Sequence, residues 1–244
     1  GQAGVRNVTV TVDDAGMHPA VDRAVEACGR AGRIDRVSIM ATGASAAAAC
    51  ASAMGLGVQI SVHLDCIQGP FILKESRFPG TPTGWLSVGR RLAEPVRREW
   101  SAQVEKLLSM GAMVTCLDSH RHIHHLPGLR QAFLTVAKEY GIGTVRAAVL
   151  PDRFRRLPGS FVLDILGKSL RREAARSGIA TARWMLGFSD AGRMDRPRLE
   201  KLIKAVGEHR AELVMHPATE NIWSRGQVGE MELMLSPWFA RALE

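Results

Sequence analysis

The sequence predicts an α/β fold, formed as a single domain by residues 1–244, whose parallel sheet is either doubly wound or closed into a (β/α) barrel. Short β-branched segments alternate with helical segments from one end of the chain to the other, which is typical of a parallel sheet. Residue types suited to catalysis follow several of the strand segments directly. The length also suits two small domains, but the chain contains no clear linker and no internal repeat.

The first half of the chain begins with VTVTV (8–12), which is short and β-branched like a strand buried on both faces. PAVDRAVEACGRAG (19–32) has helical spacing, with Pro19 suited to its first turn and Gly32 to its end. The next predicted elements are a strand at 36–40, an Ala-rich helix at 44–54, a strand at 58–64 and a helix at 94–111. The last of these has one apolar stripe, formed by Val96, Trp100, Val104, Leu107 and Leu108.

The second half continues the alternation with a fourth strand, MVTCLDS (113–119), and a helix that ends near Tyr140. The remaining predicted strands are TVRAAV (144–149), ARWMLGF (182–188) and ELVMH (212–216). The remaining predicted helices are 160–177, 196–209 and 229–242. Regions 66–90 and 150–160 contain scattered Pro and Gly and are predicted to be long loops of the kind that covers an active site.

Composition limits the classes of partner and compartment. The net charge of +8 would attract nucleic acid, anionic lipid or an anionic substrate. With one Tyr and no basic motif interleaved with aromatic residues, we expect no nucleic-acid partner. The cysteines at 28, 50, 66 and 116 form no paired motif, so reduced, buried thiols are expected. The chain has no membrane-spanning apolar stretch and no signal-peptide pattern at its start, which favours a cytoplasmic protein.

Polar residues gather at the ends of the predicted strands. The strand ends carry Asp13-Asp14, His63-Leu64-Asp65, Asp118-Ser119-His120, Arg146 and His216. The carboxyl ends of barrel strands converge on one face, where the active sites of such folds form. Scattered polar residues have no reason to recur at that position, so the sequence predicts an enzyme.

The segment CLDSHRHIHHLPGL (116–129) holds four of the eight histidines. If the chain stays extended beyond Asp118, then His120, His122 and His124 lie on the same side as Asp118 and face the barrel mouth. Alternate residues of a strand lie nearly 7 Å apart, so not all of these side chains can bind one ion. We expect one or two to bind a metal, with the others orienting ligands or touching substrate, and Asp118 to hydrogen-bond a ligating imidazole.

The adjacent carboxylates of Asp13 and Asp14 repel each other, so a site that holds both benefits from a cation or a proton. One carboxylate on a metal and the other as a proton acceptor is one interpretation. The alternative is that either residue caps the helix that begins near Pro19, and the two roles are compatible.

The motifs VTVDDAGM, VQISVHLDC, CLDSHRHIHHLPGL and ELVMHPATEN resemble, in order and spacing, those of the YdjC-like carbohydrate deacetylases, over residues 7–244. The resemblance implies a deformed TIM-like (β/α) barrel, a divalent cation and an N-acetylated sugar or glycoconjugate as substrate. It also implies that Asp14, His63 and His120 are metal ligands and that Asp13 is the general base. His216 would be the general acid, and Arg146 would orient the base.

The chain departs from the family pattern beside the acids, where Ala15 replaces a Phe and Val12 an Ala. The loss of the aromatic side chain widens the expected pocket and leaves the sugar undetermined. Two histidines and one carboxylate suit Zn²⁺, whereas Mg²⁺, with which the family is commonly described, prefers oxygen ligands. The sequence therefore predicts a divalent cation, Zn²⁺ or Mg²⁺.

Two alternative functions stay open at the level of sequence. A metal-dependent phosphoesterase or amidohydrolase is one, although such enzymes more often place H-x-H at the first strand, and a non-catalytic glycan-binding barrel is another. Helix 160–177 has apolar and basic sides, which suits either ordinary packing or a weak contact with an anionic surface. The outer helix faces also leave a homodimer open.

Overall fold

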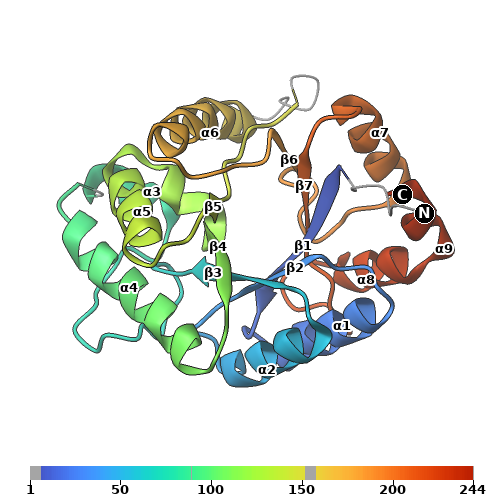
Figure 1. Ribbon diagram of the computed structural model, residues 1–244, viewed down its shortest axis with the longest axis horizontal. Coiled ribbons are helices and arrows are strands. Elements are labelled where there is room, and N and C mark those ends of the chain that lie inside the picture. The colour runs from blue at the N-terminus through green and yellow to red at the C-terminus, as the bar shows by residue number, and fades with distance from the viewer. Residues whose placement is uncertain (1–6, 89, 152–157, 244) are drawn as a thin grey trace.

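The described residues form seven parallel strands in one curled sheet, with helices around its outer face (Figure 1). This computed structural model describes residues 7–88, 90–151 and 158–243. The strand order is β5-β4-β3-β2-β1-β7-β6. The strands are β1 Val8–Ala15, β2 Arg36–Ile39, β3 Gln59–Leu64, β4 Val114–Ser119, β5 Thr144–Val145, β6 Trp184–Leu186 and β7 Ala211–Met215. The predicted deformed (β/α) barrel is confirmed, and each predicted strand corresponds to an observed one.

The sheet curls into a half-barrel whose edge strands, β5 and β6, are the two shortest. Near this opening the Met185 N–H donates a hydrogen bond to the Val149 carbonyl at 2.8 Å, which links β6 to the segment after β5. The deformation of the barrel is therefore located between β5 and β6, where backbone pairing is sparse.

Most of the predicted helices form close to their expected bounds. The helices are α1 Pro19–Arg30, α2 Ala46–Leu56, α3 Pro82–Val88, α4 Ala93–Ser109, α5 Pro127–Glu139, α6 Pro158–Arg176, α7 Arg196–Val206, α8 Gln227–Leu235 and α9 Pro237–Ala242, with a 3₁₀ helix, η1, at His120–His125. None of the helices in the described ranges is long and apolar enough to cross a bilayer.

One loop prediction and one helix prediction need correction, and a second loop prediction is only partly covered. Region 66–90 is not all loop, because α3 lies inside it. The single helix expected at 229–242 is divided at Ser236, whose hydroxyl accepts a hydrogen bond from the Phe239 N–H and so begins a new helix with Pro237 in its first turn. Most of the predicted loop 150–160 falls on residues 152–157, which lie outside the described residues.

The core lies on both faces of the sheet, as the β-branched strands predict. The adjacent residues Val10 and Thr11 of β1 point to opposite faces of the sheet, and both are fully buried. On the outside, Trp100 of α4 meets Phe133 of α5 edge to face, with ring centroids 6.1 Å apart. All four cysteines are buried and free, as expected, and burial raises the pKa of the Cys116 thiol to about 12.

Candidate active site

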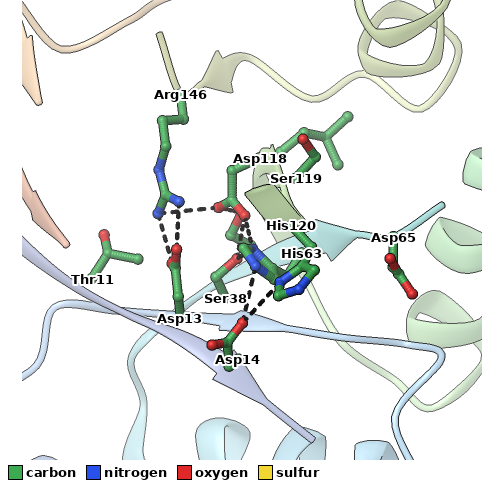
Figure 2. A network of polar contacts seen from close by, with 12 residues as sticks. Thr11, Asp13, Asp14, Ser38, His63, Asp65, Asp118, Ser119, His120 and Arg146 are labelled. Carbon is green, nitrogen blue, oxygen red and sulfur yellow. Dashed lines mark hydrogen bonds and ion pairs between the residues drawn. The ribbon is translucent and has the colours of Figure 1, made fainter. Parts of the chain in front are cut away.

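The end of β1 directs its two aspartates to different partners. The pairing with β2 becomes irregular between Val12 and Ala15, and Asp14 adopts a left-handed conformation with φ of 64°. Asp is among the residue types that tolerate this conformation. Asp13 consequently reaches Arg146, while Asp14 reaches His63 and His120 (Figure 2).

Asp14, His63 and His120 bring three ligand atoms together. Asp14 Oδ1 lies 3.3 Å from His63 Nε2 and 3.2 Å from His120 Nδ1, and the three ligand atoms lie within 4.8 Å of one another. A tetrahedral ion with bonds of about 2.05 Å holds neighbouring ligand atoms roughly 3.3 Å apart. Burial alone would raise the pKa of Asp14, but hydrogen bonds with His120 and His63 hold it well below its usual value. The donor set, its burial and its spacing fit a divalent cation.

Asp118 lies behind His63 and fixes the orientation of its ring. One carboxylate oxygen contacts His63 Nδ1, and the carboxylate also accepts hydrogen bonds of 2.6 Å from the hydroxyls of Ser38 and Ser61. With Nδ1 occupied in this way, His63 Nε2 is directed toward Asp14 (Figure 2). Asp118 is fully buried and does not line the cavity, so it contacts the His63 imidazole from behind.

A second trio, Asp13, His63 and Asp118, also has ligand atoms close enough to hold an ion. Its carboxylates are already engaged, because Arg146 binds both oxygens of Asp13 and the two serines bind Asp118. In contrast, Asp14, His63 and His120 all line the cavity, and the described partners of the Asp14 carboxylate are these two imidazoles. The trio of Asp14, His63 and His120 is therefore the better cation site.

Arg146 follows β5 and binds Asp13 with both terminal nitrogens. Nη1 donates to Asp13 Oδ2 at 2.7 Å and Nη2 to Oδ1 at 2.8 Å, which is a planar fork. Nη2 also donates to Glu212 at 3.0 Å and lies 3.5 Å from Asp118. Burial alone would lower the pKa of Arg146, but the carboxylates of Asp118, Asp13 and Glu212 raise it well above its usual value. The guanidinium is thus a fixed cation that holds the Asp13 carboxylate in one orientation.

His216 follows β7 and lies on the Asp13 side of the cavity. Its Nε2 is 3.9 Å from Asp13 Oδ2, and its ring meets Trp223 edge to face at 5.3 Å. The His216 N–H donates to the carboxylate of Glu230 at 2.5 Å, which fixes the backbone at this point. Two groups able to exchange protons, Asp13 and His216, therefore face the same space beside the candidate cation site.

The histidine cluster does not continue β4, so the predicted row of Asp118, His120, His122 and His124 on one side of an extended strand is wrong. The strand ends at Ser119, and His120–His125 form the 3₁₀ helix η1. Within it, Arg121 and His122 are left-handed, with φ of 54° and 56°. The turn destroys the period-two alternation and sends the imidazoles in different directions.

The three later histidines have separate environments. His122 lines the cavity and contacts Phe188 edge to face at 5.5 Å, and burial lowers its pKa well below the usual value. His124 is fully buried away from the cavity, stacks on Phe133, and makes a 2.9 Å hydrogen bond to the Arg146 carbonyl oxygen. His124 therefore contacts the backbone of Arg146 and not the barrel mouth. His125 is also buried, and its hydrogen bonds are with backbone atoms.

The cavity in front of these groups has a volume of about 550 Å³. It is lined by Asp13, Asp14, Met17, His63, Gln68, Ser119, His120, Arg121, His122, Met185, Gly187, Phe188, Ala191, Val214, His216 and Trp223. Asp65, although it follows the strand that carries His63, is turned away from this group (Figure 2). Its carboxylate accepts hydrogen bonds from the amides at 67–69 and so shapes the following loop.

A family model described as YdjC-like protein matches residues 7–244, which is nearly the whole chain. The chain belongs to the YdjC-like family. The resemblance found in the four sequence motifs is thereby confirmed.

Several curated relatives of this YdjC-like chain are named carbohydrate deacetylase. The one from Xenopus laevis is 30% identical over 156 residues, covering 58% of this chain and 51% of that protein. The one from Homo sapiens is 26% identical over 262 residues, covering 91% of this chain and 78% of that protein. The chain thus spans about half the length of several of the curated relatives it matches.

A crystal structure from Enterococcus faecalis V583 has a similar fold, with a TM-score of 0.73 and 20% identity. The match covers 96% of this chain and 92% of that one, whose protein is described as a candidate for cellobiose-phosphate cleavage. This likeness supports the half-barrel architecture of the YdjC-like chain.

Sequence reasoning missed residues that contact Asp118 and Arg146 without lining the cavity. Ser38 and Ser61 lie inside strands, and Glu212 begins the ELVMH motif but precedes the strand end. A charged residue within a strand buried on both faces was the available signal for Glu212, since such a residue needs an ionic partner. The two serines carried no comparable signal, because small polar residues are common in strands.

Proposed function

We propose that this YdjC-like protein is a metal-dependent carbohydrate deacetylase, which hydrolyses the N-acetyl group of an amino sugar, oligosaccharide or glycoconjugate. The observation that carries the proposal is the divergence of two consecutive carboxylates: Asp14 faces two imidazoles, while Asp13 is held by Arg146 beside His216. The names of the curated relatives support the same activity.

Asp14, His63 and His120 would hold the divalent cation, and their mixed oxygen and nitrogen donors suit Zn²⁺ better than Mg²⁺. When bound, such an ion polarises the acetyl carbonyl and lowers the pKa of water. Asp118, together with Ser38 and Ser61, keeps the His63 ring in the orientation that this role requires.

Asp13 acts as the general base and accepts a proton from the attacking water. Its fork with Arg146 fixes the direction of the carboxylate, and each oxygen keeps a lone pair free for that proton. Glu212 and Asp118 also share the positive charge of Arg146, so only part of that charge compensates the Asp13 carboxylate.

His216 acts as the general acid and donates a proton to the nitrogen of the departing sugar amine. An amine is a poor leaving group unless it is protonated, so this step is as necessary as the attack of water. The Glu230 carboxylate fixes the His216 backbone, and Trp223 limits rotation of the ring. Water loses one proton to Asp13 and the amine gains one from His216, which balances the hydrolysis to acetic acid and a free amine; the acid then ionises to acetate in solution.

The cavity accommodates a substrate of the proposed class. Its volume of about 550 Å³ lies within the range of small-molecule sites. Aromatic rings of Phe188 and Trp223 line it together with the polar groups of Gln68 and Arg121. Apolar walls with a few polar groups suit a sugar ring, which has apolar faces and hydroxyl edges.

The proposal is tested by measuring acetate release from a panel of N-acetylated sugars and glycoconjugates, with Zn²⁺ supplied. We expect release by the wild type, and a fall on the order of 10²–10⁴-fold in Asp13→Asn and in His216→Gln, since each change removes a proton-transfer group. Both variants should still bind Zn²⁺ in calorimetry, because neither changes a proposed ligand.

Asp65→Asn is the matched control, since Asp65 is a buried strand-end acid that does not approach the imidazoles. It should retain most of the acetate release. Equal acetate release by the wild type and Asp13→Asn would contradict the proposed base, and no release from any substrate by Zn²⁺-loaded wild type would contradict the activity.

A further inference from the structure

Large apolar side chains are exposed around the mouth of the half-barrel. Three βα segments carry them, after β3, β5 and β7, and their exposed fractions range from 38% to 73%. They are Leu86, Phe161, Val162, Ile165, Ile222 and Trp223. Because these segments follow the carboxyl ends of parallel strands, they lie at the same edge of the sheet as the candidate active site. These six residues are called the mouth face below.

Contacts connect the mouth face to the wall of the cavity. Helices α3 and α6, which carry Leu86 and Phe161, both pack against η1, and Trp223 lines the cavity itself. The Ser160 and Ser189 hydroxyls lie 3.2 Å apart, which joins the first turn of α6 to the residue after Phe188. Exposed apolar side chains from distant parts of the sequence therefore lie around one opening.

Unpaired positive charge accompanies these apolar side chains. Arg77, Arg121 and Arg225 are exposed on the βα segments after β3, β4 and β7, and none has a carboxylate partner in the described parts of the chain. The acids nearest to them in sequence are engaged, with Glu75 paired to Arg98 and Glu220 to Arg23. The chain as a whole carries +8. The mouth face is thus apolar and surrounded by cations.

We infer that the mouth face docks on an anionic lipid bilayer. Apolar side chains that include a Trp enter the interfacial layer of a membrane, and arginines beside them attract anionic headgroups. A protein partner would be expected to leave a more varied set of polar groups, whereas the described charged groups on these segments that lack a partner are all cations, Lys74 among them. Docking in this orientation turns the cavity toward the headgroup layer. This inference concerns binding and does not depend on the proposed deacetylation.

Vesicle flotation tests the inference with the full chain. We expect binding to phosphatidylcholine vesicles that contain phosphatidylserine, weaker binding without phosphatidylserine, and loss of most binding between about 0.1 M and about 1 M salt, since salt screens the arginines. Arg77→Gln, Arg121→Gln and Arg225→Gln should each weaken binding about fivefold. The double change Phe161→Ser with Ile165→Ser should weaken it on the order of tenfold through lost apolar burial.

The opposite edge of the sheet offers a matched control. Met54 and Met113 are also exposed, but they lie before β3 and β4, at the amino ends of the strands. Met54→Ser with Met113→Ser should leave vesicle binding unchanged. Equal losses in the control and in the mouth-face variants, or no binding to anionic vesicles at low salt, would overturn the inference. So would a dimer, seen by sedimentation without vesicles, that the Phe161 and Ile165 changes dissociate.

Discussion

The interior of the half-barrel holds several charges that are stable only in combination. Arg146 meets Asp13, Glu212 and Asp118, and Glu212 is also approached by Arg36 at 3.5 Å. Removing one member of such a group leaves an uncompensated charge out of water, which is far more costly than losing an exposed ion pair. The residues behind the site thus serve the fold and the chemistry together.

His125 illustrates how burial fixes a protonation state. Its Nδ1–H donates to the His122 carbonyl at 2.9 Å, and its Nε2 accepts from the Ala148 N–H at 2.8 Å. A second proton would have to sit on Nε2, facing a donor. Burial lowers the pKa of His125 to about 3, so the folded protein keeps this ring neutral.

This neutral state predicts a pH-dependent stability. The pKa of His125 in the folded protein lies below its value of about 6.5 in the unfolded chain. The stabilisation that the neutral ring gives the folded state is therefore complete above about pH 6.5 and is lost as pH falls toward about 3. The contribution of His125 at pH 5 should be lower than at pH 7 by roughly 2 kcal/mol. Urea unfolding at the two pH values measures this difference in the free energy of unfolding.

His125→Gln is the comparison for that measurement, because it cannot titrate. Its free energy of unfolding should be lower than that of the wild type at pH 7, through poorer hydrogen bonding, but should fall less between pH 7 and pH 5. The same fall in both proteins would contradict the prediction.

Among the elements, η1 is the one with the most strained backbone. Arg121 and His122 adopt left-handed conformations in succession, although neither is Gly, and both line the cavity. Strain of this kind costs of order 1–3 kcal/mol per residue and persists where the surroundings enforce it. The fixed ends of η1, His120 at the candidate cation site and His124 against Arg146, supply that constraint.

Relief of this strain is measurable. Arg121→Asn should raise the free energy of unfolding by about 0.5–1 kcal/mol, because Asn adopts the left-handed conformation more readily than Arg. Thermal or urea unfolding measures the change. The same substitution at Arg172, exposed within α6, should lower stability by about 0.5 kcal/mol, since Asn is the poorer helix former. Changes of the same sign at both positions would contradict this account of the turn.

The same element marks the limit of prediction from sequence. Strands and helices follow from hydrophobic periodicity, and strand-end residues such as His63 and His216 follow from the strands. The turn at His120–His125 depends on what its ends contact, so extrapolating the strand placed His124 at the mouth when it lies behind Arg146. The helix α3 was missed for a related reason, because its short segment has too few residues to establish a period.

At the scale of the whole molecule, a cation at Asp14, His63 and His120 would bind three strand ends of the sheet at once, since these residues follow or end β1, β3 and β4. The unfolded chain does not hold these ligands together, so cation binding should stabilise the fold.

Zn²⁺ at about 100 times its dissociation constant should raise the free energy of unfolding by about 2.7 kcal/mol. The melting temperature with and without Zn²⁺ measures this effect. Asp14→Ala should abolish most of the rise, whereas Asp65→Asn should retain it. A full rise in Asp14→Ala would place the ion elsewhere.

Arg146 follows β5 at one margin of the sheet, yet its guanidinium meets carboxylates on β1 and β7, beyond the middle of the strand order. Backbone pairing between β5 and β6 is sparse. The two sides of the half-barrel are therefore joined across its interior by opposite charges. Evolution of such a fold is free to lengthen or reshape the backbone at that opening. It is not free to reverse the sign of a single interior charge, because that would push the two halves of the wall apart.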